Sequence, residues 1–414
     1  MQPYVYDKEN SSKIEDFQIR EVLISKLRKR FETYGYKQIQ TSVFEAYDVY
    51  ANLSGTVNKD DMIKVIDSSG KVLVLRPDVT IPITRMEALN KQPLQEEKRY
   101  FYILDVFRQL SAQNGQKEHT QAGIEYLGKS TPEVDAEVIM LAVHLLKDLN
   151  FANFKIEIGH AGFTKELISN LSLSNGQQEQ LESYIQSKNL AELEAFLADL
   201  PIKTEWKQAI KQIPMMYGRP DEVIKQVKAI PIPGPLEQEL ENLIKLWKVL
   251  EAYEISDNVV LNLGLINNMD YYTGIIFQGY VENTGRPVLM GGRYDQLGVQ
   301  YDKHIPAIGF AAEVDVLLQA VIQQGLITKK REIRDFIIFY DKNKQKEALT
   351  TAFELRTKDY RVLTFSADEE IDLDGRYELF FTSTGNELRS GRQVRPFSNT
   401  ADLVRILEEM KEGS

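Results

Sequence analysis

The chain has 414 residues, 43% of them hydrophobic and 27% charged, and its 50 Lys and Arg against 61 Asp and Glu give a net charge of −11. This length predicts two or three domains of roughly 150 residues each. The absence of cysteine excludes disulfides, thiolate metal sites and cysteine nucleophiles. Only four histidines occur, without a His-Glu-x-x-His pattern, so a zinc enzyme is not expected. The acidic balance also disfavours a wide nucleic-acid-binding face.

Targeting signals are not evident in the sequence. No apolar run approaches the about 18 residues that a membrane helix needs, and the first residues lack the apolar core of a signal peptide. We therefore expect a soluble, cytoplasmic protein.

The first part of the chain predicts a helix followed by short strands. Apolar residues recur at helical spacing through residues 14–34, and Gly35 is a stop signal. Residues 41–50 are typical of a strand or extended chain. A strand over 71–76 then leads to Thr80, a candidate N-cap for the next helix.

Two consecutive strands come next. Residues 100–108 and 118–126 have strand patterns, and the polar segment between them contains a glycine, which predicts a β-hairpin with a long loop. Thr131 followed by proline opens a helix, with Thr131 as N-cap and the proline at the first helical position. Residues 154–158 predict a further strand.

The middle of the chain changes character. Residues from about 164 to 255 are rich in Leu, Glu, Gln, Lys and Ala and lack strand patterns, which predicts a helical insert. Strand patterns resume at 258–263 and 271–281, and glycine-containing turns lead to a helix near 312–324. The preceding residues together predict one domain over 1–325.

Residues 331–414 predict a separate small α/β module. Apolar strands alternate there with helical segments, which is typical of a small open sheet with crossover helices. This stretch contains 14 Lys and Arg against 17 Asp and Glu, so it is not a basic arm.

Polar residues gather on one face of the second hairpin strand. Alternation places His119, Gln121, Gly123 and Glu125 on the same face, beside Arg108 of the partner strand. One interpretation is the solvent face of an antiparallel sheet. The other is a polar pocket on a sheet floor, lined by carboxylate, amide and guanidinium groups.

Such a pocket would suit a small zwitterion. Carboxylates at Asp78 and Glu125 could accept hydrogen bonds from an ammonium group, and Gln121 could supply a neutral orienting contact. Tyr271 and Tyr272 could add phenolic hydroxyls and flat apolar walls, although adjacent tyrosines are more often packing residues.

A glycine-containing segment, MGGRYDQLG at 290–298, superficially suggests a phosphate-binding loop. It lacks the Gly-Lys-Ser/Thr ending and precedes no strand–helix fingerprint, so a tight glycine turn between sheet elements is favoured. No serine–histidine–aspartate or paired-carboxylate hydrolase arrangement can be argued from spacing.

Taken together, these segments resemble the catalytic core of the histidyl-tRNA synthetases. The matching stretches follow in the family's order over most of the first 320 or so residues: YGYKQIQT (34–41), LRPDVT (75–80), VFRQLSAQNGQKEHTQAGIEYLG (106–128), MDYYTGIIFQGY (269–280), GGRYDQL (291–297) and PAIGFAAEVDVL (306–317). The resemblance implies an α+β fold with a class II aminoacyl-tRNA synthetase-like core, in which helices flank an antiparallel sheet and a helical insert precedes the last strands. Residues 331–414 resemble a shortened anticodon-binding module.

The chain departs from the synthetases at residues that hold ATP there. Arg108 is retained, but Leu110 and Ser111 replace the Glu and second Arg of the hairpin motif. Asn267 replaces an arginine before the paired tyrosines, and Val316, after Asp315, replaces the arginine that clamps the nucleotide. Because adenylate formation depends on positioned cations, these losses predict that the chain has no catalytic residues and makes no aminoacyl-adenylate.

The residues of the amino-acid pocket, by contrast, match those of the synthetases. The resemblance places Asp78 and Thr80 near the α-ammonium of histidine, Gln121 at the amino group, and Glu125, Tyr271 and Tyr272 around the imidazole, with Tyr294 lining the same site. Arg108 completes the histidine-binding set, and no metal ligand or cofactor is implied.

This combination resembles the regulatory subunits of ATP phosphoribosyltransferase, paralogues of the synthetases. The resemblance implies a regulatory subunit that activates the short catalytic subunit in the first step of histidine biosynthesis and takes part in feedback inhibition by histidine. It also implies self-association within a hetero-octamer, with no tRNA and no membrane among the partners. The alternatives are a divergent histidyl-tRNA synthetase and a stand-alone histidine- or tRNA-binding protein.

Overall fold

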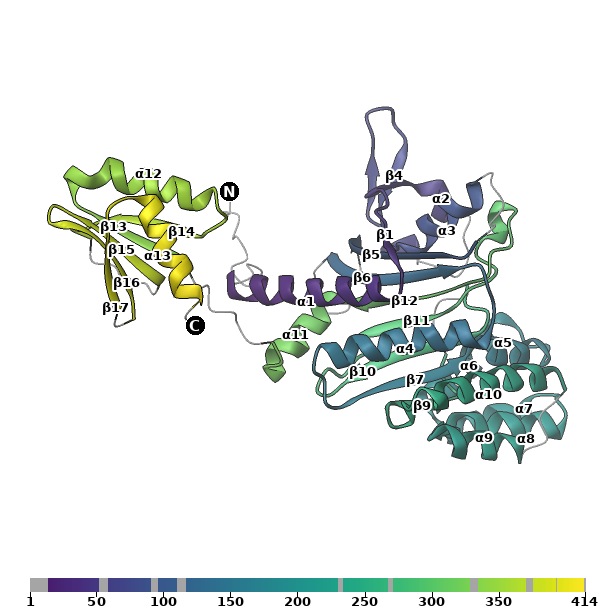
Figure 1. Ribbon diagram of the computed structural model, residues 1–414. Helices are drawn as coiled ribbons and strands as arrows, with labels where there is room; N and C mark the ends of the chain where they lie inside the picture. The colour runs from purple at the N-terminus through teal and green to yellow at the C-terminus, as the bar shows by residue number, and fades with distance from the viewer. Residues whose placement is uncertain are drawn as a thin grey trace, which may run out of the picture. The chain divides into compact units, whose positions relative to one another are not determined.

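The computed structural model describes residues 14–51, 59–90, 96–109, 117–229, 234–266, 271–327, 334–369, 375–391 and 393–412. The chain divides into two compact units, residues 1–328 and 329–414. Figure 1 shows the elements of both units in the colours of the chain order.

The first unit is built on one large, mostly antiparallel sheet. Its strand order in the described part of the chain is β1-β5-β6-β12-β11-β10-β7-β9-β8. The predicted hairpin is present as β5 and β6, paired from Lys98↔Leu127 to Phe107↔Glu118. The strands are β1 (Lys37–Gln38), β5 (Lys98–Phe107), β6 (Glu118–Leu127), β7 (Phe154–His160), β8 (Tyr217–Gly218), β9 (Val259–Asn262), β10 (Ile275–Val281), β11 (Leu289–Arg293) and β12 (Ala307–Glu313).

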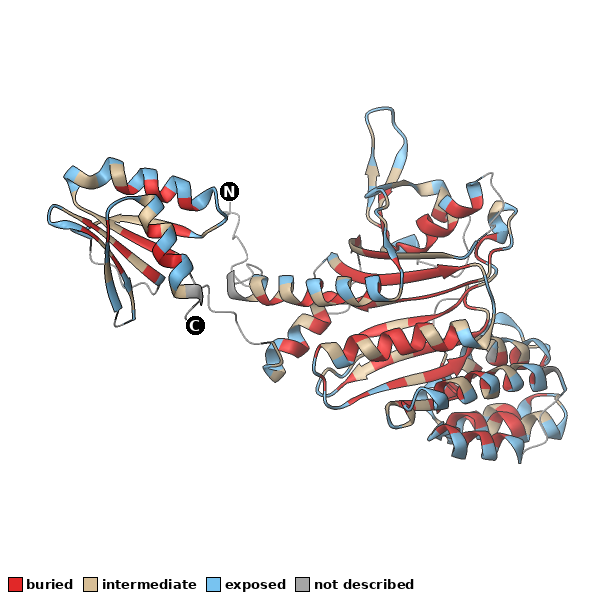
Figure 2. Cartoon of the chain, in the orientation of Figure 1, coloured by how far each residue is buried: buried red, intermediate tan, exposed pale blue. Residues whose placement is uncertain are grey.

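Helices cover one face of this sheet with an apolar core. Helices α1 (Ile14–Thr33), α4 (Pro132–Asp148) and α11 (Val314–Gln324) pack their buried side chains against Ile124 and Phe310 of the sheet. The predicted start of α4 is confirmed, because the Thr131 side chain accepts a hydrogen bond from the Val134 N–H. Figure 2 shows α4 and the central strands as largely buried.

A smaller layer covers the opposite face. It contains β2 (Phe44–Ala46), β3 (Lys64–Ile66) and β4 (Val72–Leu75), in the order β2-β4-β3, with α2 (Tyr47–Ala51) and α3 (Thr80–Leu89). This layer and the large sheet share a second core that includes Val79, Ile81 and Tyr102.

Two local predictions in this layer are wrong, the first of them only in part. The stretch expected to be a strand or extended over residues 41–50 contains β2 but turns helical at Tyr47. Thr80 does not cap α3, because it is the first helical residue and its hydroxyl is bonded to Glu125. The Ile81 N–H is instead satisfied by Asp78 Oδ1, 2.8 Å away. The Asp-Val-Thr sequence contains two side chains that could accept a hydrogen bond from the first turn of α3, and Asp78 is the one that accepts it.

Helices follow β7 and lead back to β9. They are α5 (Ala161–Ser169), α6 (Asn175–Ser187), α7 (Leu190–Asp199), α8 (Thr204–Gln212), α9 (Pro220–Lys228) and α10 (Glu237–Ala252). The prediction that this segment contains no strand is wrong at one place, because the short strand β8 lies within it and pairs with β9.

One histidine joins this helical segment to the sheet. His160 ends β7 and caps α5, where its Nδ1 accepts a hydrogen bond from the Phe163 N–H at 3.1 Å. Its Nε2 lies 3.3 Å from Glu239 of α10. Burial lowers the pKa of His160 to about 4, so the ring is neutral at pH 7 and carries its proton on Nε2.

The glycine turn expected at Gly291 and Gly292 is not a turn. Both residues lie inside β11, which pairs with β10 and β12 on its two sides. A Cβ at Gly292 would lie 2.7 Å from the Ile275 carbonyl oxygen of β10 and 2.8 Å from the Tyr272 ring. The glycines are therefore required by close packing between strands rather than by a change of chain direction.

The second unit contains a mixed sheet of order β14-β13-β15-β16-β17, covered on one face by two helices. Its elements are β13 (Arg334–Tyr340), α12 (Gln345–Arg356), β14 (Val362–Ser366), β15 (Gly375–Thr382), β16 (Gly385–Ser390), β17 (Gln393–Phe397) and α13 (Thr400–Glu412). Strands β16 and β17 were not predicted, because their sequences carry charged residues and no continuous apolar run. None of the helices in the described ranges is long and apolar enough to cross a membrane.

Candidate functional site

The sequence-predicted site residues line one cavity on the α3 side of the large sheet. All eight of them contribute to its wall: Asp78, Thr80, Arg108, Gln121, Glu125, Tyr271, Tyr272 and Tyr294. His119, which alternation placed on the same strand face, does not line it. The cavity measures about 50 Å³, several times the roughly 10–15 Å³ that a single ordered water needs. It therefore accommodates a small polar group.

The strand register explains why these side chains meet. Residues Gln121 and Glu125 alternate onto one face of β6, and both are buried, which contradicts the solvent-face interpretation of this strand. On the neighbouring strand β12, Gly309 lies opposite Glu125 and leaves room for its carboxylate. A small residue opposite a large polar one thus creates the hollow in the sheet floor.

Glu125 is the most deeply buried carboxylate of the site, with an exposed fraction of 2%. Its Oε1 accepts a hydrogen bond from the Thr80 hydroxyl at 2.6 Å, and its Oε2 accepts one from the Tyr294 hydroxyl. Burial raises the pKa of Glu125 to about 8, and the neighbouring Asp78 adds to the rise, even though both hydroxyls favour the ionised form. A cation placed against Glu125 would reverse this shift.

Asp78 is the second buried carboxylate of the cavity. Burial raises its pKa, and the Ile81 N–H and the Arg108 guanidinium partly offset that rise. Arg108 is held in place by donating from Nε to the Pro77 carbonyl at 3.0 Å. The site therefore combines two buried carboxylates with one guanidinium, a set suited to a ligand that carries both an ammonium and a carboxylate.

Three tyrosines form an aromatic wall. The rings of Tyr271 and Tyr272 have centroids 4.7 Å apart, and Tyr271 meets Tyr294 edge-on at 5.8 Å. Flat apolar surfaces next to a carboxylate can enclose a planar, protonatable ring such as imidazole.

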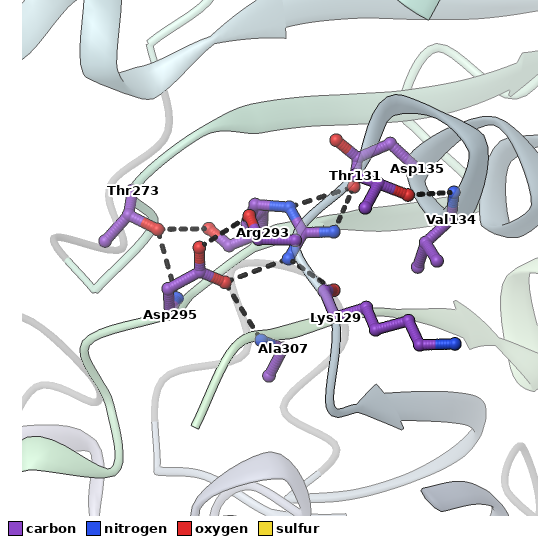
Figure 3. Close-up of polar contacts among 9 residues, drawn as sticks. Lys129, Thr131, Val134, Asp135, Thr273, Arg293, Asp295 and Ala307 are labelled. Atoms are coloured by element: carbon purple, nitrogen blue, oxygen red, sulfur yellow. Dashed lines mark hydrogen bonds and ion pairs between the residues drawn. The ribbon is translucent and has the colours of Figure 1, made fainter. Parts of the chain in front are cut away.

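Arg293, the residue before Tyr294, anchors the end of β11. Figure 3 shows the buried Arg293 guanidinium donating to Asp135 at the start of α4 and to Asp295. Asp295 also accepts from the Ala307 N–H at 2.9 Å, and its own N–H donates to Thr273 Oγ1. These bonds tie the end of β11 and Asp295 to the start of α4, to Thr273 and to the start of β12.

The positions that depart from the synthetase pattern lie partly outside the described residues. Asn267, Leu110 and Ser111 belong to segments that the structure does not describe. Val316 is buried in the core between sheet and helices and does not line the cavity. The adjacent Asp315 accepts a hydrogen bond from the Thr120 N–H at 3.0 Å.

Sequence reasoning missed Tyr102, Met290 and Glu313, which also line the cavity. Tyr102 lies opposite Gly123 across the hairpin, so the hairpin register would have revealed it. Glu313 stands out as a charged residue at the end of an otherwise apolar strand, and its side chain accepts a hydrogen bond from Gln121.

Comparison with known proteins places the chain in a family. The family model described as histidyl-tRNA synthetase matches residues 13–317. An ATP phosphoribosyltransferase regulatory subunit from Oceanobacillus iheyensis is 45% identical over 387 residues, which cover 93% of this chain and 94% of the relative. The protein of the same name from Ruminiclostridium cellulolyticum is 35% identical and covers 85% of this chain and 84% of its own length.

Solved structures agree with this assignment. A crystal structure from Bacillus halodurans, titled ATP phosphoribosyltransferase regulatory subunit/histidyl-tRNA synthetase, has a TM-score of 0.78 and 25% identity and covers 92% of this chain and all of that one. Histidyl-tRNA synthetase from Nostoc shares the fold, with a TM-score of 0.74, 18% identity and 96% coverage of both chains. The fold is thus the class II synthetase-like α+β fold that the sequence predicted, and the chain belongs to the family of ATP phosphoribosyltransferase regulatory subunits.

Proposed function

We propose that this chain binds histidine in the cavity described above and has no catalytic activity of its own. The observation that carries this proposal is the pairing of buried Asp78 and Glu125 with Gln121 and Arg108, which together offer partners for an ammonium and a carboxylate. The aromatic wall beside Glu125 suits the imidazole. Val316, buried in the core, supports the loss of adenylate chemistry because it supplies no cation.

In this proposal the chain activates the short catalytic subunit of ATP phosphoribosyltransferase in the cytoplasm and conveys feedback inhibition by histidine. The names of the relatives support such a partner. The assembly would be a hetero-octamer, and tRNA would not bind, in keeping with the net charge of −11.

Mixing the purified chain with a short-form catalytic subunit tests the proposal. We expect the two chains to elute as one complex, the phosphoribosyltransferase turnover to rise on mixing, and histidine to lower that turnover again. Separate elution with an unchanged turnover would contradict the proposed partner. Histidine-dependent ATP–pyrophosphate exchange by the chain alone would contradict the absence of catalysis.

A further inference from the structure

A buried amide and a carboxylate are paired at one end of the cavity. Gln121 of β6 and Glu313 of β12 are register partners in the sheet, and the Gln121 Nε2 donates to Glu313 Oε1 at 2.7 Å. Both residues line the cavity. Glu313 also precedes α11 as its N-cap residue, but its side chain makes no capping hydrogen bond, so it is available for Gln121.

The backbone holds Glu313 in this position. Its N–H donates to the Val288 carbonyl at 2.9 Å, which attaches the end of β12 to the start of β11. The carboxylate is therefore a fixed acceptor next to Gln121.

A fixed acceptor determines which way the Gln121 amide faces. A glutamine amide has an NH₂ donor on one side and an oxygen acceptor on the other, and an ionised carboxylate can only accept. Turning the amide over would bring two acceptors together, so Glu313 selects the orientation in which NH₂ faces it. In the described ranges no donor is bonded to Gln121 Oε1, which leaves this oxygen to accept from a ligand.

We propose that Glu313 is a positioning residue that makes this end of the cavity select a ligand ammonium group. It does so by orienting Gln121 Oε1 as an acceptor. The inference rests on the proposed histidine-binding function. It specifies which group of the ligand this end of the cavity recognises, namely the ammonium.

A pair of ligands that differ only in the ammonium group tests this role. Calorimetry is performed with histidine and with 3-(imidazol-4-yl)propanoate, on the full chain and on Glu313→Gln. We expect Glu313→Gln to weaken histidine binding by about tenfold, as for the loss of a hydrogen bond to a charged group. Binding of the propanoate should change by less than about twofold, because it has no ammonium for Gln121 to accept from.

A second background separates positioning from general structural damage. In a Gln121→Ala chain, Glu313→Gln should have no further effect on histidine binding, because the residue through which it acts is gone. Glu282→Gln, an exposed glutamate outside the cavity, is the matched control. If Glu313→Gln fails to fold, Glu313→Asp shortens the side chain by one methylene and should show the same selective loss.

Each other result overturns the inference. Equal losses for the two ligands, or the same loss in the Gln121→Ala background, would show that Glu313 does not act through the amide. Normal histidine binding by Glu313→Gln would overturn this inference alone. If the unaltered chain binds neither ligand, the proposed histidine site is overturned together with it.

Discussion

Glu125 is held in a pocket that disfavours its charge, although two hydroxyls donate to it. Burial removes water from the carboxylate, and Asp78 nearby places a second acid in the same cavity. With a pKa of about 8, the folded chain without ligand retains a proton on Glu125 at neutral pH. A bound cation would favour the ionised form and release this proton, so ligand binding and protonation at Glu125 are linked.

This linkage predicts how stability depends on pH. The pKa of Glu125 rises from 4.5 to about 8 on folding, so between these values the folded state binds a proton that the unfolded chain has lost. The contribution of this residue to the free energy of unfolding is therefore greatest below pH 4.5 and declines as pH rises through about 8. We expect Glu125→Gln, which cannot ionise, to remove this decline.

Thermal unfolding of both proteins from pH 5 to 9, without histidine, measures the effect. The melting temperature of the unaltered chain should fall relative to that of Glu125→Gln as pH rises. Parallel pH profiles for the two proteins would mean that Glu125 is not protonated in the folded chain.

Two glycines in neighbouring strands allow the close packing around the cavity, and one of them, Gly309, lines it. Gly123 in β6 and Gly309 in β12 lie where a Cβ would meet a side chain or the backbone of the adjacent strand. At Gly309, the added Cβ would overlap the Glu125 carboxylate and the Ile124 backbone. The sheet can hold a buried acid here only because the facing residue has no side chain.

Gly309→Ala should therefore damage both folding and binding. Overpacking in a sheet interior costs about 1–3 kcal/mol, and here it also displaces Glu125. We expect a lower melting temperature and a loss of histidine binding in calorimetry. Gly176→Ala is the control, because a Cβ there meets no atom within 4 Å and lies in the first turn of α6. Unchanged affinity in Gly309→Ala would show that the missing side chain at this position is not needed to place Glu125.

The sequence predicted elements better than it predicted their contacts. Period-two alternation in β6 is a local property, so it correctly placed Gln121 and Glu125 on one face. The Thr80 hydroxyl was misassigned to a helix cap because its partner, Glu125, is 45 positions away and only the folded chain brings them together. Gly291 and Gly292 were misread as a turn because a glycine that avoids a clash with a neighbouring strand looks, in sequence, like a glycine that turns the chain.

At the scale of the whole molecule, the cavity and the C-terminal module belong to different compact units. All the described residues that line the cavity lie in the unit of residues 1–328. The unit of residues 329–414 has a core of its own, in which Phe336, Leu379 and Leu403 are buried between the sheet and its two helices. Because each unit buries its own apolar surface, removal of the second should leave the first folded.

We therefore expect a chain that ends at residue 328 to unfold cooperatively and to bind histidine within about twofold of the full chain's affinity. Circular dichroism during heating and calorimetry with histidine measure the two properties, with the full chain as reference. A loss of about tenfold or more in affinity, in a truncated chain that still unfolds cooperatively, would show that the second unit supports the cavity. Retained affinity would place the module's role in the proposed complex with the catalytic subunit, where turnover of the mixed enzyme can be compared with and without residues 329–414.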